Sequence, residues 1–160
     1  MEHDHRLTGV RVVDLSTGIP GGYCTTLLAD AGADVIKVER SDRGDDTRAW
    51  GPPFLDSDAQ LSSYFAAFNR GKRSFALDFH AQGALDLLAS LCTHADVVIE
   101  NFRPGVAESL GLEWSVLRKH NPSLVLCSIC GFGRNGPYSH LPATEIVVEG
   151  LSGLMEITGP

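Results

Sequence analysis

Short apolar runs alternate with segments of helical periodicity along this chain, and the alternation predicts its fold. The apolar runs have the length of strands and lie at residues 9–15, 33–39, 74–78, 97–99 and 124–129. Apolar residues recur at helical spacing at 23–31, 61–68, 81–93, 106–110, 114–120 and 145–156. Strands that alternate with helices indicate an α/β fold, with a parallel sheet and helices on both of its faces.

The fourth run, Val97–Ile99, ends abruptly in the polar loop of residues 100–105. Open α/β sheets bind ligands just beyond the carboxyl ends of such buried strands. In this loop Asn101 offers an amide, Phe102 a flat apolar face, and Arg103 a guanidinium suited to phosphate or carboxylate. We therefore expect a binding loop, and an ordinary strand exit with a solvated arginine is the alternative.

The segments at the ends of two other predicted strands also contain residues that could bind a ligand. A glycine-rich turn at 16–22 precedes a helix, whose first N–H groups can face an anion. Its glycines do not form the Gly-x-Gly-x-x-Gly pattern, which argues against an NAD-binding domain. Glu39 and Arg40 end the second run, where an acid suits ribose hydroxyls and an arginine suits an added phosphate. The long polar stretch 41–58 is either functional or a solvent-facing excursion.

Composition and charge narrow the class of protein. Of the 160 residues, 43% are hydrophobic and 21% charged, as in globular domains, and no apolar run has the length of a membrane span. The net charge of −7 argues against nucleic acid or an anionic membrane as a partner. Residues 1–6 lack the apolar core of a secretory signal, so a cytoplasmic location is expected.

The four cysteines are scattered, and only Cys127 and Cys130 have the spacing of a metal or redox pair. Residues three apart on a strand point to opposite faces, and no second pair completes four zinc ligands. We therefore expect two small buried side chains and no metal site.

Five segments, taken together, resemble the family III CoA-transferases, a family that also contains the acyl-CoA racemases. The segments follow one another with unbroken spacing and lie at 12–16, 28–40, 69–74, 100–105 and 131–138. The resemblance implies a Rossmann-like large domain that binds CoA, within a protein that forms an interlocked homodimer. Because family members are considerably longer, residues 1–160 are expected to be the N-terminal part of that large domain, with the second domain beyond Pro160.

The resemblance also implies a set of CoA contacts. Matched by motif, they fall on Ile19, Pro20, Arg40, Leu77, His80, Asn101, Phe102 and Arg103. Arg40 and Arg103 can meet phosphates, with Arg40 favoured for the ribose 3′-phosphate, while Phe102 and Leu77 can line the adenine or pantetheine. Lys72 and Arg73 are close enough in sequence to assist, or they are ordinary helix-end residues. Ser109 stands where many members have an arginine contact.

The transferases of the family use an aspartate that attacks the acyl-CoA thioester and forms an aspartyl anhydride. By the resemblance that aspartate lies beyond Pro160. The racemases instead use a histidine and an aspartate, and their aspartate-containing motif matches residues 142–145, where Thr144 replaces histidine and Glu145 replaces aspartate. The racemase activity is therefore less favoured. Glu145 is the one catalytic candidate in the chain, or it complements a helix dipole.

The expected function is transfer of CoA from an acyl-CoA to a carboxylic acid, with these 160 residues inactive alone. A catalytically silent half that binds CoA or forms a dimer is the alternative, and an aspartate followed by glycines downstream would separate the two. The identities of the acyl donor and acceptor do not follow from the sequence.

Overall fold

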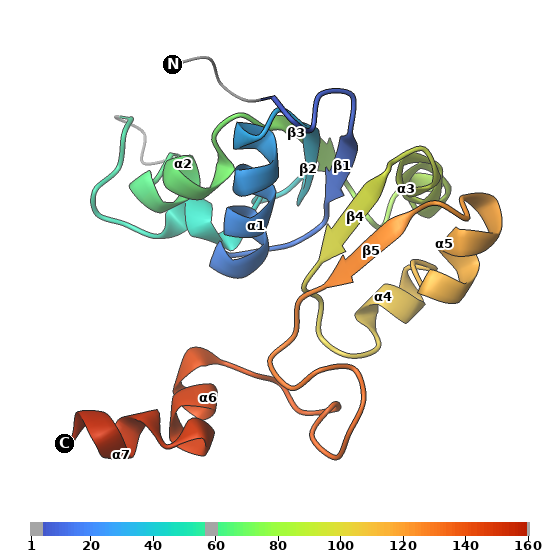
Figure 1. Cartoon of the computed structure of the whole chain (residues 1–160). Coiled ribbons are helices and arrows are strands. Elements are labelled where there is room, and N and C mark those ends of the chain that lie inside the picture. Colours follow the sequence, from blue (N-terminus) through green and yellow to red (C-terminus); the bar gives the residue numbers. More distant parts are fainter. Residues whose placement is uncertain (1–4, 57–60, 160) are drawn as a thin grey trace.

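A computed structural model describes residues 5–56 and 61–159, and its centre is a five-stranded sheet (Figure 1). All strand pairs are parallel, and the spatial order is β3-β2-β1-β4-β5. The strands are β1 (Arg11–Asp14), β2 (Asp34–Arg40), β3 (Arg73–Leu77), β4 (Val97–Glu100) and β5 (Val125–Ser128). The predicted α/β class and parallel sheet are confirmed, with each strand within a few residues of its predicted run.

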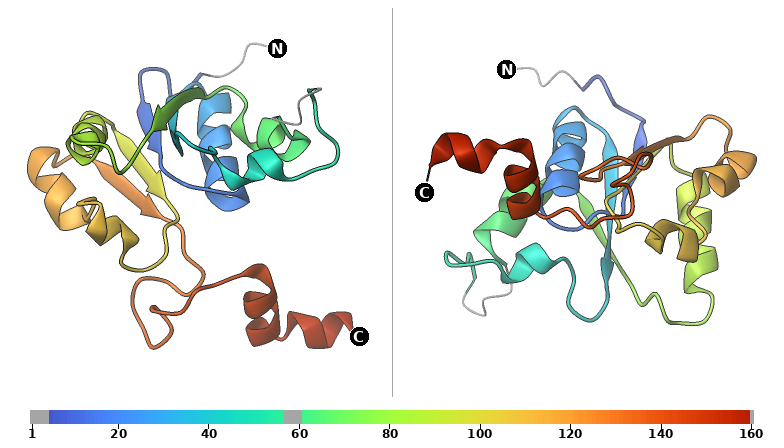
Figure 2. Two further views of the ribbon diagram at one scale, coloured as in Figure 1. Left: turned by 180° about the vertical axis from the view of Figure 1, so that it is seen from behind. Right: turned by 90° about the horizontal axis from the view of Figure 1, so that it is seen from below.

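Helices cover both faces of this sheet (Figures 1 and 2). One face carries α1 (Ile19–Asp30) and α2 (Ser63–Asn69), and the other carries α3 (Ala84–Thr93) and α5 (Trp114–His120), with the short α4 (Val106–Ser109) beside α5. Helix α1 begins four residues earlier than its apolar periodicity predicted. Pro20 lies in its first turn, where a proline costs no helical hydrogen bond, so the helix includes Gly21 and Gly22.

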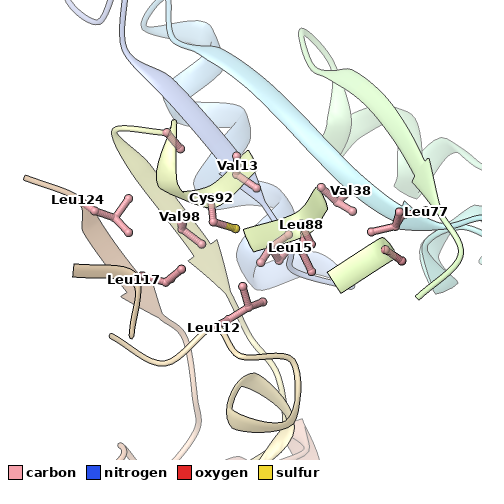
Figure 3. Packing of buried hydrophobic residues seen from close by; sticks show 12 residues of the cluster. Val13, Leu15, Val38, Leu77, Leu88, Cys92, Val98, Leu112, Leu117 and Leu124 are labelled. Atoms are coloured by element: carbon pink, nitrogen blue, oxygen red, sulfur yellow. The ribbon is translucent and has the colours of Figure 1, made fainter. Parts of the chain in front are cut away.

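The core has two layers because successive residues of β1 point to opposite faces. Val13 packs with Val98 of β4 and with Leu88 and Cys92 of α3 (Figure 3). Val12 packs on the other side, in the layer that holds Val35, Ile99 and parts of α1. Burial raises the pKa of the Cys92 thiol to about 12, which makes it an inert core residue.

The polar stretch after β2 is more ordered than its composition suggests. It contains one 3-10 turn, η1 (Asp46–Ala49), and Phe54 forms an antiparallel bridge with Ser62. The Ser62 hydroxyl caps α2 by accepting the Phe65 N–H at 3.0 Å, and it donates to the Thr47 carbonyl. Part of this stretch, 57–58, lies outside the described residues. The segment is therefore tied to both β2 and α2.

The last thirty residues leave the sheet. After β5 an irregular segment leads to α6 (Glu145–Ser152) and α7 (Leu154–Thr158), which stand apart from the sheet (Figure 1). The prediction of one helix over 145–156 is wrong, because Gly153 adopts a left-handed φ of +79° that ends α6. Both helices expose apolar side chains, with Ile146 70% and Ile157 84% exposed. No helix in the described part of the chain is long and apolar enough to cross a membrane.

The prediction that Cys127 and Cys130 are both buried is also wrong. Strand β5 ends at Ser128, so Cys130 lies beyond the sheet and is exposed, while Cys127 on the strand is half-buried. No group of three or more His, Cys, Asp or Glu residues within 5–56 and 61–159 could hold a metal ion.

The close approach of α1 to the exit of β1 leads to a first prediction. A Cβ atom on Gly21 would lie 2.1 Å from the Cβ of Ser16, so Gly21→Ala is expected to lower the free energy of unfolding by about 1–3 kcal/mol. Gly150→Ala in α6 is the control, because its new Cβ would lie 3.8 Å from the nearest atom, the sulfur of Met155. Urea unfolding measures both, and equal stability of the two variants would contradict the packing at Gly21.

Candidate functional site

A cleft of about 320 Å³ opens at the carboxyl edge of the sheet, where β1 lies between β2 and β4. The chain passes from β1 to α1 on one face, and after β3 to α3 on the other, so this is the topological switch point of the sheet. Ligands of open α/β sheets bind at such a point. The lining is mostly apolar with a few charged groups, and it includes Leu15, Val38, Arg40, Asp46, Phe79, Phe102 and Leu110.

The turn after β1 forms one side of the cleft and is held from behind by two buried charges. Asp45 accepts the Gly18 N–H, with its two oxygens at 3.3 and 3.2 Å. The Lys37 ammonium donates to the Ser16 carbonyl at 2.9 Å and pairs with Asp45 at 2.9 Å. Both charged side chains are at most 2% exposed, so the turn has little freedom to move.

A second ammonium, that of Lys72, balances another buried carboxylate, Asp14. Asp14 lies 3.1 Å from the Lys72 ammonium and 3.9 Å from that of Lys37, and it accepts the Thr25 hydroxyl at 2.6 Å. Two carboxylates and two ammonium groups thus neutralise one another inside the protein. Removing one partner of such a set leaves an uncompensated buried charge, which costs several kcal/mol, about 3–5 in measured cases.

Glu39 at the end of β2 anchors the segment that follows it. Its carboxylate accepts Arg48 at 2.7 and 2.9 Å and the Asp45 N–H at 3.0 Å. Burial alone would raise the pKa of Glu39, but the hydrogen bonds from Arg48 and from the Asp45 backbone outweigh burial and lower it. Burial likewise opposes ionisation of Asp45, and the nearby Lys37 charge with the Thr47 hydrogen bonds lowers its pKa. Both acids are therefore ionised at neutral pH in the folded protein.

The exit of β4 is joined directly to the exit of β1. The Asn101 side chain accepts the Thr17 N–H at 2.8 Å and donates to the Thr17 carbonyl at 2.7 Å. Glu100, only 1% exposed, accepts the Phe102 N–H at 2.9 Å and forms an ion pair with Arg134. These contacts hold the backbone of Phe102 where its ring lines the cleft.

Of the eight residues that the family's motifs predict as CoA contacts, two line this cleft and the others lie on adjoining segments. Arg40 and Phe102 line it, and the Arg40 guanidinium pairs with Asp46 at 2.9 Å. Leu77 is buried beside Arg40 in the β2–β3 ladder, and Ile19 and Pro20 form the first turn of α1. Asn101 joins the exits of β1 and β4, and the other two, His80 and Arg103, are exposed on the segments after β3 and β4. The Arg103 guanidinium makes no hydrogen bond or ion pair with any residue that the structure describes.

Three expected site residues lie elsewhere. The Lys72 ammonium contacts Asp14, Asn69 and the carbonyls of Gly22 and Phe68, and burial, partly offset by Asp14, lowers its pKa. Arg73 begins β3 at the opposite edge of the sheet and pairs with Asp34 at 2.8 Å. Glu145 is exposed at the start of α6. The cleft thus excludes all three.

The buried supports of the cleft were not identified from the sequence. Lys37 gave a signal, because it interrupts the apolar run of β2 and a buried charge requires a partner. The sequence does not show that Asp45 is its partner, because several other acids lie in the same stretch. The pairing of Glu100 with Arg134 joins residues 34 positions apart and has no local pattern.

The pair of Asp45 and Lys37 leads to a second prediction. Asp45→Asn is expected to lower the free energy of unfolding at neutral pH by about 3–5 kcal/mol, because the Lys37 ammonium loses its nearest counter-charge. The lowered pKa of Asp45 gives stability that is complete above about pH 4, the unfolded value, and is lost as pH falls through the folded value. Below pH 4 the free energy of unfolding of the variant is therefore expected to change less with pH than that of the wild type.

Urea unfolding between pH 2.5 and 7, in roughly half-unit steps across this window, measures both effects. Asp42→Asn is the matched control, since Asp42 is exposed and, among the residues that the structure describes, accepts only the adjacent Arg43 N–H. A change within about 0.5 kcal/mol is expected. The same stability at pH 7 for the two variants would refute the role of Asp45.

Comparison with known proteins identifies the family. The sequence matches CoA-transferase family III over residues 7–160. It is 46% identical over 156 residues to the succinate–glutarate CoA-transferase of Agrobacterium fabrum, covering 96% of this chain and 39% of that protein. It is 42% identical over 151 residues to the acetyl-CoA:oxalate CoA-transferase of Acetobacter aceti, covering 94% of this chain and 38% of that protein.

A solved structure agrees with these sequence matches. The crystal structure of a CAIB/BAIF family protein from Brucella suis has a TM-score of 0.88 and 45% identity, covering 96% of this chain and 40% of that one. The chain therefore spans 38–40% of the length of these relatives. The resemblance inferred from the five motifs is confirmed, and the chain belongs to CoA-transferase family III.

Proposed function

We propose that this chain binds CoA in the cleft at the switch point, and that the protein to which it belongs transfers CoA from an acyl-CoA to a carboxylic acid. The observation that carries the proposal is a cleft at the switch point that holds both Arg40 and Phe102. Membership of the family supports the reaction, and relatives named for succinate, glutarate and oxalate favour dicarboxylic acids as its acyl substrates.

The two ends of the nucleotide require different surroundings, and the cleft offers both. Leu15, Val38 and Phe102 supply apolar surface for an adenine ring. Nη2 of the Arg40 guanidinium donates to Asp46. The other N–H groups of this guanidinium suit the ribose 3′-phosphate. Arg103 and the first turn of α1, at Ile19 and Pro20, suit the diphosphate.

The proposed chemistry follows the family. A carboxylate attacks the thioester carbonyl, the C–S bond breaks, and CoA leaves as a thiolate while an acyl anhydride forms. The CoA thiolate attacks the enzyme's carbonyl in this anhydride, which releases the donor acid and leaves an enzyme–CoA thioester. The acceptor carboxylate attacks that thioester, expels the CoA thiolate again and forms an anhydride with the enzyme. The thiolate then attacks the acceptor's carbonyl, which gives the new acyl-CoA and frees the enzyme carboxylate. No residue of this chain matches the family's aspartate, and Glu145 is the acid whose position comes nearest to a family catalytic motif. We further propose that the protein acts as an interlocked homodimer, to which the exposed apolar faces of α6 and α7 would contribute.

The third prediction tests the two arginines. Arg40→Ala and Arg103→Ala are each expected to weaken CoA binding tenfold or more, because a charge-assisted contact to phosphate contributes about 1.5–3 kcal/mol. If Arg40 binds the 3′-phosphate, its loss is expected to matter much less for dephospho-CoA. Isothermal titration calorimetry on the naturally occurring protein measures these affinities.

Arg11→Ala provides the control for this experiment. Arg11 also forms an exposed ion pair, with Asp96 at 3.5 Å, but at the amino edge of the sheet. Unchanged CoA affinity is expected for this variant. If both Arg40→Ala and Arg103→Ala bind CoA with wild-type affinity, the proposal that the cleft binds CoA is wrong.

The fourth prediction concerns catalysis by these 160 residues alone. We expect no CoA exchange between succinate and a second acid, because the family's nucleophile has no counterpart among them. Exchange assayed by chromatography of the acyl-CoA species, with size-exclusion of the same sample, measures the result. Clear exchange by a monomer of 17.2 kDa would make Glu145 the leading nucleophile, and its loss in Glu145→Gln would establish that role.

A further inference from the structure

A second cleft lies next to the first and is formed by the motif 131–138, to which the proposed nucleotide site gives no role. Its volume is about 220 Å³, and its lining includes Phe102, Gly105, Gly133, Arg134, Ser139 and His140. Phe102 lines both clefts. A single ligand that passes this ring could therefore occupy both.

The buried carboxylate of Glu100 contacts residues on two walls of this second cleft. Glu100 accepts the Phe102 N–H at 2.9 Å and forms an ion pair with Arg134, which belongs to the opposite wall. Arg134 also lies 3.5 Å from the exposed Glu108. The start of the same loop is confined as well, because a Cβ on Gly131 would lie 2.0 Å from that of Ala143.

The lining suits a neutral chain with amide groups better than a phosphate. The charge of Arg134 is already matched by Glu100 and Glu108, so a second anion gains little there. Glycine backbone at 105 and 133 and the Ser139 hydroxyl offer hydrogen-bond partners, while Phe102 and Pro104 offer apolar surface. The pantetheine arm of CoA has this composition, with two amides and a branched aliphatic group.

We propose that Arg134 is a positioning residue: through its ion pair with Glu100 it holds the 131–140 loop against Phe102, so that the second cleft receives the pantetheine arm. The inference rests on the proposed CoA site. The first cleft, at about 320 Å³, is near the lower limit of ligand pockets, so the rest of CoA must extend beyond it.

The test compares CoA with adenosine 3′,5′-bisphosphate, which shares the nucleotide end but lacks the arm. On the naturally occurring protein, Arg134→Ala is expected to raise the Kd for CoA about tenfold and to leave the Kd for the bisphosphate unchanged. Arg134→Lys retains a cation for Glu100 and is expected to recover much of the loss. Glu100→Gln keeps an acceptor for Phe102 but removes the charge, and the same selective loss is expected.

The outcomes separate this inference from the proposed function. Arg70→Ala is the control, because Arg70 forms an exposed ion pair with Asp30 away from both clefts, and it should change neither Kd. Wild-type protein that binds neither ligand would refute the CoA site itself. Wild-type protein that binds both, with Arg134→Ala weakening both equally or neither, would overturn only the role of Arg134. Thermal unfolding checks each variant, and if Arg134→Ala does not fold, Glu100→Gln decides the matter by the same comparison.

Discussion

The ammonium of Lys37 lies within the central sheet, and the shape of the sheet's carboxyl edge depends on how that charge is neutralised. An ammonium without a counter-charge is too costly at a site that is 1% exposed, so the chain after β2 must fold back and bring Asp45 to it. That return places Asp45 under the Gly18 N–H and Asp46 beside Arg40. A single buried charge thereby links the interior of β2 to the arrangement of the cleft.

Sequence patterns predicted the sheet and its helices because strand and helix periodicities are local. They also placed Arg40 and Phe102 at the carboxyl ends of parallel strands, and both residues line the cleft at that edge of the sheet, while their contact with CoA stays a prediction. They did not predict the direction of Lys72, which depends on how closely α1 and α2 pack at Gly22. The break at Gly153 was missed because apolar residues continue at helical spacing on both sides of it.

Electrostatic balance distinguishes the interior of this domain from the carboxyl edge of its sheet. Inside, the charges of Asp14, Lys37, Asp45 and Lys72 cancel, and Glu39 pairs with Arg48. At the edge, Arg40 is only partly satisfied by an exposed aspartate and Arg103 has no charged partner among the described residues. The net charge of −7 is thus unevenly distributed, with the interior charges paired and Arg103 at this edge without a counter-charge among the described residues.

The side-chain amide of Asn101, after β4, forms hydrogen bonds with both the N–H and the carbonyl of Thr17, after β1. The turn after β1 and the loop after β4 are therefore joined by the protein's own hydrogen bonds, and a ligand in the proposed site does not have to bring them together. Association then requires little ordering of the main chain, and most of the entropy lost belongs to the ligand. A long flexible ligand would lose the most, which makes rigid mimics of its bound shape the natural starting point for inhibitors of such a site.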